Sequence, residues 1–152
     1  MKLIKDKKLT FKNTFDFNSL VDLIDRNNFI TTLTGNWIER YIFDNAICLQ
    51  NVEKSYLFED IFKECNNMFN PDKKRSDLDL FFSFNSGGKG IAHTDKYDVC
   101  IIGLLGKTLY KNSKEEYIVQ PGDALYIKGG EEHRAIGLTP RIILSYGFGD
   151  KL

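Results

Sequence analysis

The second half of the chain contains a series of short apolar segments separated by turn residues. The segments are rich in β-branched and aromatic residues, and glycine, proline and aspartate occupy the gaps between them. Segments of this kind are typical of β-strands, and many short strands at regular spacing favour a sandwich or a barrel. The predicted strands cover residues 78–84, 99–105, 116–119, 124–127 and 141–146.

The first part of the chain has the periodicity of helices instead. Residues 15–24 carry leucine and isoleucine at the i, i+3, i+4 spacing of one helical face, with Asp16 or Asn18 suited to cap the helix. The same spacing predicts a second helix from about Ser55 to Phe69. Helices followed by strands favour an α+β fold, in which the helices brace one side of the sheet.

The length of the chain limits the number of domains, and its charge balance limits the kinds of partner it can bind. A chain of 152 residues has room for one core, so we predict a single domain over residues 1–152. Within it, residues 1–70 are predicted to be mainly helical and residues 76–148 to form the β core. The 21 basic and 21 acidic residues give a net charge of +0, which argues against binding nucleic acid through its phosphates.

The sequence predicts a protein of the cytoplasm. No apolar run is long enough to cross a bilayer, and the first residues lack the apolar centre of a signal peptide. Cys48, Cys65 and Cys100 are an odd number of cysteines at unrelated spacings. That pattern is typical of free, mostly buried thiols in a reducing compartment.

The chain has only 2 histidines, His93 and His133. His93 and Asp95 form an H-x-D pair, and side chains at i and i+2 of an extended segment point to the same side. Two histidines and one carboxylate on one face of a metal leave its other positions open, as in the facial triad of non-haem Fe(II) oxygenases. Against this, a lone H-x-D pair is common by chance, and either histidine alone is more often an ordinary surface or core residue.

The segment before His133 is more specific. A Pro-Gly-Asp turn at residues 121–123 precedes a short apolar strand, and Gly129 and Gly130 follow that strand. The turn starts the strand, and the glycine pair lets the chain reverse tightly so that His133 points inward.

Three blocks between residues 76 and 148 resemble a known family. They are Phe82–Phe84 with glycines 87, 88 and 90, then residues 93–107, then residues 121–127 with His133 and residues 145–148. In order and spacing these blocks resemble the cupin-fold, JmjC-type Fe(II)/2-oxoglutarate-dependent oxygenases. The likeness is strongest to the ribosomal-oxygenase branch, whose members hydroxylate ribosomal proteins.

The resemblance implies a double-stranded β-helix, which is the jelly-roll or cupin core, braced by N-terminal helices. It implies His93, Asp95 and His133 as ligands of Fe(II), with 2-oxoglutarate and O₂ as co-substrates. The implied activity is that of a dioxygenase, which hydroxylates or demethylates its substrate and releases succinate and CO₂. By this resemblance the substrate is a protein, such as a ribosomal protein, although a small molecule is an open alternative. No nucleic-acid or membrane partner is expected, and the sequence leaves the oligomeric state open.

The distal carboxylate of 2-oxoglutarate requires a basic residue. The family carries one two residues after the glycine that matches Gly106, where this chain has Thr108. Lys107 lies one residue earlier, and strand alternation turns it to the opposite face unless a bulge intervenes. Many other 2-oxoglutarate oxygenases place an arginine near the position of Arg141. We therefore prefer Arg141, with Thr108 as a hydroxyl partner and Ser83 as a further candidate. The alternative for Arg141 is an exposed charge at a strand end.

Other residues and other functions stay open. Asp98 is interpreted as a residue that supports the ligands or forms a turn, and Tyr97 and Tyr126 either line the pocket or belong to the core. One alternative function is a metal-binding cupin that uses no 2-oxoglutarate, with Glu131 or Glu132 as a fourth ligand. The other is a binding module whose catalytic site has decayed.

Overall fold

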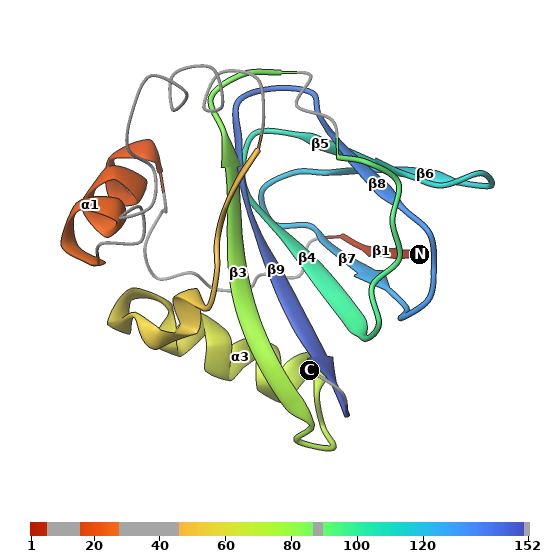
Figure 1. Ribbon diagram of the computed structural model, residues 1–152, viewed down its shortest axis with the longest axis horizontal. Coiled ribbons are helices and arrows are strands. Elements are labelled where there is room, and N and C mark those ends of the chain that lie inside the picture. Colours follow the sequence, from red (N-terminus) through yellow and green to blue (C-terminus); the bar gives the residue numbers. More distant parts are fainter. Residues whose placement is uncertain (6–15, 28–45, 87–89, 151–152) are drawn as a thin grey trace.

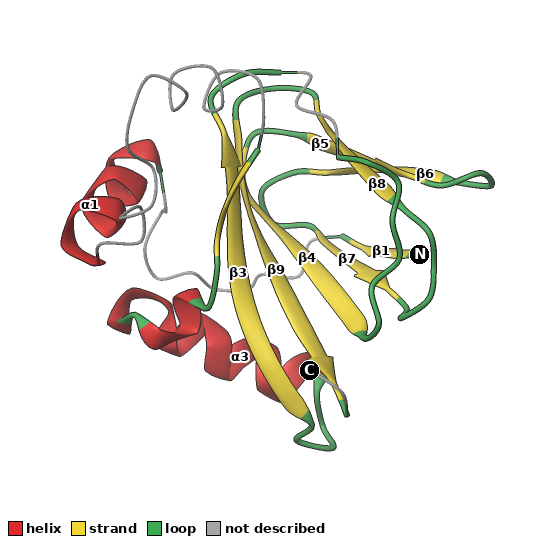
Figure 2. Cartoon of the chain, viewed as in Figure 1, coloured by secondary structure: helices red, strands yellow, loops and turns green. Residues whose placement is uncertain are grey.

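The computed structural model describes residues 1–5, 16–27, 46–86 and 90–150, and its strands form two facing antiparallel sheets (Figures 1 and 2). Gly87 and Gly88, which belong to the first block of the family resemblance, lie outside the described residues. The strands of the large sheet are, in spatial order, β1 (Lys2–Ile4), β7 (Ala124–Ile127), β4 (Asp98–Leu105), β9 (Arg141–Gly149), β3 (Arg75–Ser83) and β2 (Ile47–Leu49). Those of the small sheet are β6 (Glu116–Val119), β5 (Thr108–Lys111) and β8 (Arg134–Gly137).

All the predicted strands are present, and four further strands join them in the described part of the chain. Strands β5 and β8 escape prediction because neither contains an apolar run; β8 is held by pairing with β5, Thr108 opposite Gly137, and β5 also pairs with β6. Strands β1 and β2 lie within residues 1–70, which the sequence predicts to be mainly helical. They pair with β7 and β3. The N-terminal segment therefore supplies both edges of the large sheet as well as the helices that brace it.

The helical elements cover one face of the large sheet. They are α1 (Phe17–Asn27), the 3₁₀ turns η1 (Val52–Lys54) and η2 (Tyr56–Phe58), and α3 (Glu59–Phe69). Asp16, one of the two predicted caps of the first helix, accepts the amide of Ser19 through Oδ1 at 2.9 Å. The second predicted helix, 55–69, begins instead with η2, where Ser55 Oγ accepts the amide of Leu57 at 3.5 Å, and α3 itself starts at Glu59 without a side-chain cap. No helix in the described part of the chain is long and apolar enough to span a membrane.

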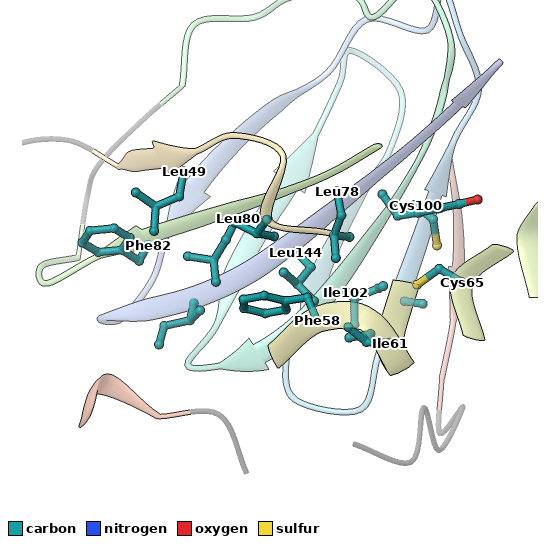
Figure 3. Close-up of a cluster of buried hydrophobic side chains, with 14 of the residues drawn as sticks. Leu49, Phe58, Ile61, Cys65, Leu78, Leu80, Phe82, Cys100, Ile102 and Leu144 are labelled. Atoms are coloured by element: carbon teal, nitrogen blue, oxygen red, sulfur yellow. The ribbon is translucent and has the colours of Figure 1, made fainter. Parts of the chain in front are cut away.

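Strand β9 separates the interior into two compartments because its side chains alternate between the two faces. Ile142, Leu144 and Tyr146 pack on the helix side, where the larger core lies against Ile61 and Cys65 of α3 (Figure 3). The Tyr146 hydroxyl also donates to Asn66 Oδ1 of α3 at 2.9 Å. The intervening Arg141, Ile143 and Ser145 face the small sheet instead.

The observed architecture confirms the predicted α+β fold with a jelly-roll core. The three cysteines are free, as predicted, with Cys65 and Cys100 buried and Cys48 half-buried. Burial raises the pKa of the Cys48 and Cys65 thiols to about 12. These thiols therefore remain protonated near neutral pH and serve as packing groups.

Candidate metal centre

A cavity of about 330 Å³ lies between the two sheets. The large sheet contributes side chains from β3, β4 and β9, and the small sheet contributes side chains from β5 and β8. Both predicted histidines and Asp95 line it, as does Arg141. The other lining residues are Ala46, Asp79, Phe81, Gly90, Tyr97, Val99, Ile101, Tyr110, Ala135, Ile143 and Ser145.

His93 and His133 are held side by side by their own backbones. The amide of His93 donates to the carbonyl of His133 at 3.0 Å, and the amide of His133 donates to the carbonyl of His93 at 2.9 Å. Residues paired in this way point to the same face, and the two imidazole centroids lie 4.5 Å apart. The pairing therefore brings together two ligands that are far apart in the sequence.

The carbonyls of neighbouring residues orient both imidazoles. His93 Nδ1 lies 2.9 Å from the carbonyl of Ile91, and His133 Nδ1 lies 3.1 Å from that of Glu131. A carbonyl only accepts hydrogen bonds, so Nδ1 carries a proton in each ring, and in the neutral imidazole this leaves the lone pair on Nε2. This is the tautomer that a metal-binding histidine uses.

Asp95 completes a convergent set of donor atoms. His93 Nε2 lies 3.8 Å from Asp95 Oδ1, and His133 Nε2 lies 3.6 Å from Asp95 Oδ2. The three donor atoms all lie within 4.8 Å of one another. His133 is 4% exposed and Asp95 27%, whereas the His93 side chain is 53% exposed. The centre is therefore anchored in the interior and open on the side of His93.

The residues present fit a divalent metal with open positions. Two neutral imidazoles and one carboxylate are the donor set of the facial triad. Among the described residues no other histidine, cysteine or carboxylate joins this cluster. Glu131 accepts a hydrogen bond from Asn112 and Glu132 is exposed, and neither lines the cavity. A fourth protein ligand from these two glutamates is thus unsupported.

A buried cation forms another part of the cavity wall. Arg141 is 2% exposed, and its side chain crosses from β9 to the small sheet, where it lies on Gly137. Thr108 is the cross-strand partner of Gly137, and Tyr110 is that of Ala135, so these residues share the inner face of the small sheet. The buried Thr108 Oγ1 has no hydrogen-bond partner among the described residues.

Burial shapes the electrostatics of this wall. It lowers the pKa of Arg141, an effect that Tyr110 partly opposes, yet a guanidinium stays charged in proteins. Burial also raises the pKa of Tyr110, so its phenol is neutral. The result is a fixed positive charge on the wall of a cavity that also includes Val99, Ile101 and Ile143. The Thr108 hydroxyl lies on the same inner face of the small sheet, but Thr108 does not itself line the cavity. Such a setting attracts an anion more strongly than bulk water would allow.

The remaining predicted contacts lie outside the cavity wall. Lys107 precedes β5, is exposed, and donates its backbone amide to Thr139 Oγ1 at 2.9 Å. Ser83 is buried and pairs across β3 and β9 with Arg141, but it does not line the cavity. Thr108 is buried on the inner side of the small sheet and Lys107 is exposed, as strand alternation requires, but Thr108 does not line the cavity either.

Of the two tyrosines predicted to line the pocket or belong to the core, only Tyr97 lines it. Tyr126 donates its hydroxyl to Asp98 at 2.7 Å instead. The sequence reasoning missed Tyr110, Asp79 and Ser145, which line the cavity. Tyr110 lies two residues after Thr108, so in a strand the two side chains point to the same face. The sequence would have predicted Tyr110 as a pocket residue only if residues 108–111 had been predicted as a strand.

Comparisons with known proteins identify the fold. No protein-family model and no curated protein sequence matches this chain. Among solved structures, the ribosomal oxygenase YcfD of Escherichia coli in complex with cobalt and 2-oxoglutarate superposes with a TM-score of 0.74 at 20% identity. That match covers 97% of this chain and 47% of the other. A second YcfD structure gives a TM-score of 0.63 at 25% identity, covering 72% of this chain and 33% of the other.

This chain therefore spans a third to a half of the YcfD chain. The predicted resemblance to the ribosomal oxygenases is confirmed in the fold. A third YcfD structure agrees, with a TM-score of 0.76 at 18% identity.

Proposed function

We propose that this chain is an Fe(II)- and 2-oxoglutarate-dependent oxygenase that hydroxylates a C–H bond. One observation carries the proposal: the His93–Asp95–His133 cluster and a buried arginine, Arg141, line the same cavity. A metal-binding group alone suits many functions, but a buried cation beside it suits a co-substrate that carries a second carboxylate.

The residues of the chain have distinct roles in this proposal. His93, Asp95 and His133 hold the metal through Nε2 and carboxylate oxygens, in the tautomers that the backbone carbonyls impose. Arg141 binds the distal carboxylate of 2-oxoglutarate, and the Thr108 hydroxyl donates to the same carboxylate. We favour Arg141 over Lys107 because Arg141 lines the cavity and Lys107 does not.

When bound, the metal and 2-oxoglutarate supply the oxidising chemistry. In the overall reaction, O₂, 2-oxoglutarate and a substrate C–H bond give succinate, CO₂ and a C–OH group, with one oxygen atom in succinate and one in the product. The chain excludes water with its apolar wall of Val99, Ile101 and Ile143, and leaves the side of His93 open for the substrate.

The proposed substrate is a protein, with ribosomal proteins as the first class to test. The support is the fold match to YcfD, which is described as a ribosomal oxygenase. The main alternative is a metal-binding cupin that uses no 2-oxoglutarate. This alternative is favoured by Thr108, which occupies the position where the family carries the basic residue that binds 2-oxoglutarate.

The first experiment separates these two functions. Fe(II) and 2-oxoglutarate are added anaerobically to wild type, His93→Ala, Arg141→Lys, Arg141→Met and Lys107→Ala, and the metal-to-ligand charge-transfer band is recorded. The proposal expects a band that requires both additions, is lost in His93→Ala and persists in Lys107→Ala. It expects roughly tenfold or more weaker 2-oxoglutarate binding in Arg141→Met, with partial recovery in Arg141→Lys. If the protein binds iron but shows no charge-transfer band at saturating 2-oxoglutarate, it is a metal-binding cupin that uses no 2-oxoglutarate.

A second experiment addresses the substrate. Purified ribosomal proteins are incubated with the loaded protein, and succinate and the mass of one added oxygen atom are both measured. Modification that depends on 2-oxoglutarate and disappears in His93→Ala supports a ribosomal substrate. Succinate released without any modified ribosomal protein would point to a different protein or a small molecule.

A further inference from the structure

We infer that Asp98 is a positioning residue for the metal centre, acting through the glycine turn that precedes His133. This inference rests on the proposed metal-binding function, because it concerns how tightly the same three ligands hold a metal. Asp98 itself does not line the cavity.

Asp98 uses both carboxylate oxygens to hold neighbouring segments. Its Oδ1 accepts the backbone amide of Gly129 at 2.9 Å, and its Oδ2 accepts the hydroxyl of Tyr126 at 2.7 Å. Asp98 is the first residue of β4, Tyr126 lies in the neighbouring strand β7, and Gly129 lies in the turn between β7 and His133. Hydrogen bonds to a charged acceptor are roughly twice as strong as neutral ones.

The same glycine turn is attached to Asp95. The amide of Gly130 donates to the carbonyl of Asp95 at 2.8 Å. Gly130 has a φ of +82°, which favours glycine, and it allows the chain to reverse at this point. A side chain at Gly129 would place its Cβ 3.0 Å from the carbonyl carbon of Tyr97, so the turn lies directly on the segment between Asp95 and Asp98.

These contacts determine how two of the ligands are placed relative to each other. His133 follows Gly130 by only a few residues, and the carbonyl of Glu131 between them orients its ring. Loss of the Asp98 carboxylate removes one of the attachments of this turn and so loosens the position of His133 relative to Asp95. Groups that orient metal ligands typically account for 10–100-fold in metal affinity.

The variants separate orientation from general stability. Asp98→Ala removes both hydrogen bonds, whereas Asp98→Asn keeps an oxygen acceptor for Gly129. Gly129→Ala displaces the turn by a different route, through the close approach to Tyr97. Asp123→Ala is the matched control: Asp123 is a buried turn aspartate whose Oδ2 accepts the amide of Gln120 at 3.3 Å, and it does not line the cavity.

The test is a Co(II) titration of each metal-free protein, followed by visible absorption, with the melting temperature of the metal-free form measured in parallel. We expect Asp98→Ala and Gly129→Ala to weaken Co(II) binding by about tenfold or more. Asp98→Asn should stay within about threefold of wild type, and Asp123→Ala should melt earlier but bind Co(II) as wild type does.

Two results would overturn the inference. One is Co(II) affinity in Asp98→Ala and Gly129→Ala equal to that of wild type. The other is an equal loss in Asp123→Ala, which would make the effect one of stability alone. A wild-type protein that binds no Co(II) is a distinguishable outcome, since it removes the metal centre and the proposed function together with this inference.

Discussion

The guanidinium of Arg141, which belongs to the large sheet, lies on the backbone of Gly137 in the small sheet. A Cβ at Gly137 would lie 3.4 Å from Nε and 3.5 Å from Cζ of Arg141. Those separations are ordinary van der Waals contacts, so one methyl group fits while a branched side chain does not. The glycine therefore provides the space through which the proposed carboxylate-binding arginine reaches its place.

We predict that Gly137→Val displaces Arg141 and weakens 2-oxoglutarate binding by about tenfold or more, because an added branch occupies the place of the guanidinium. Gly137→Ala is the matched control and should bind 2-oxoglutarate nearly as wild type does. Titration of the iron-loaded protein with 2-oxoglutarate measures both. Equal affinities in the two variants would show that the guanidinium position is not what 2-oxoglutarate recognises.

Thr108→Val is predicted to have opposite effects on the free and the co-substrate-bound protein. Thr108 Oγ1 is buried without a hydrogen-bond partner among the described residues, so its removal should leave the free energy of unfolding unchanged or raise it by up to about 1 kcal/mol. The same change removes a donor to the distal carboxylate and should weaken 2-oxoglutarate binding several-fold.

Ser83→Ala is the control for this prediction. Ser83 Oγ is also buried without a partner among the described residues, and neither Ser83 nor Thr108 lines the cavity. Ser83 belongs to the large sheet, however, whereas Thr108 lies in the small sheet opposite Gly137, on which Arg141 lies. Denaturant unfolding and 2-oxoglutarate titration of both variants check the prediction. A similar loss of affinity in the two variants would argue against a specific role for Thr108.

Asp77 predicts a pH dependence of stability. Burial, with further contributions from Asp79 and Glu53, raises its pKa from the ordinary 3.8 to about 6. A carboxyl whose pKa is raised in the folded state binds its proton more tightly there. Its contribution to the free energy of unfolding therefore falls as the pH rises from about 4 to about 6, and remains unfavourable above that range.

Asp77→Asn should therefore raise the melting temperature at pH 7.5 and have little effect near pH 3.5, as measured by thermal unfolding across that range. Asp72→Asn, at an exposed turn position, is the control variant. Asp77→Asn that stabilises equally at both pH values would contradict the assigned role of burial.

Metal binding should stabilise the fold through the three ligands together. At a free Co(II) concentration about 100 times the dissociation constant, the free energy of unfolding should increase by about 2.7 kcal/mol. Asp95→Asn keeps the shape of the side chain but removes its charge, and should abolish most of this increase. Thermal unfolding with and without Co(II) measures it, and an undiminished increase in Asp95→Asn would place the bound ion elsewhere.

The sequence predicted the local features well because they depend on neighbouring residues. Strands 116–119 and 124–127 appear with the predicted bounds, and the second helix ends at Phe69 as expected. Strands β5 and β8 were not predictable from apolar runs, since their residues form strands through pairing within the small sheet, β5 with both β6 and β8. Likewise, the sequence left open whether Tyr126 lines the pocket or belongs to the core, and the structure packs it against the larger core with its hydroxyl on Asp98.

The sequence by itself determined the β-rich second half, the H-x-D pair and the tight turn before His133, because alternation, i and i+2 geometry and glycine turns are local properties of the chain. The tertiary structure decided which side chains meet. The pairing of His93 with His133, the reach of Arg141 over Gly137 and the hold of Asp98 on Gly129 each join segments from different parts of the chain. Such contacts depend on strand register and on the separation of the two sheets, which no local pattern specifies.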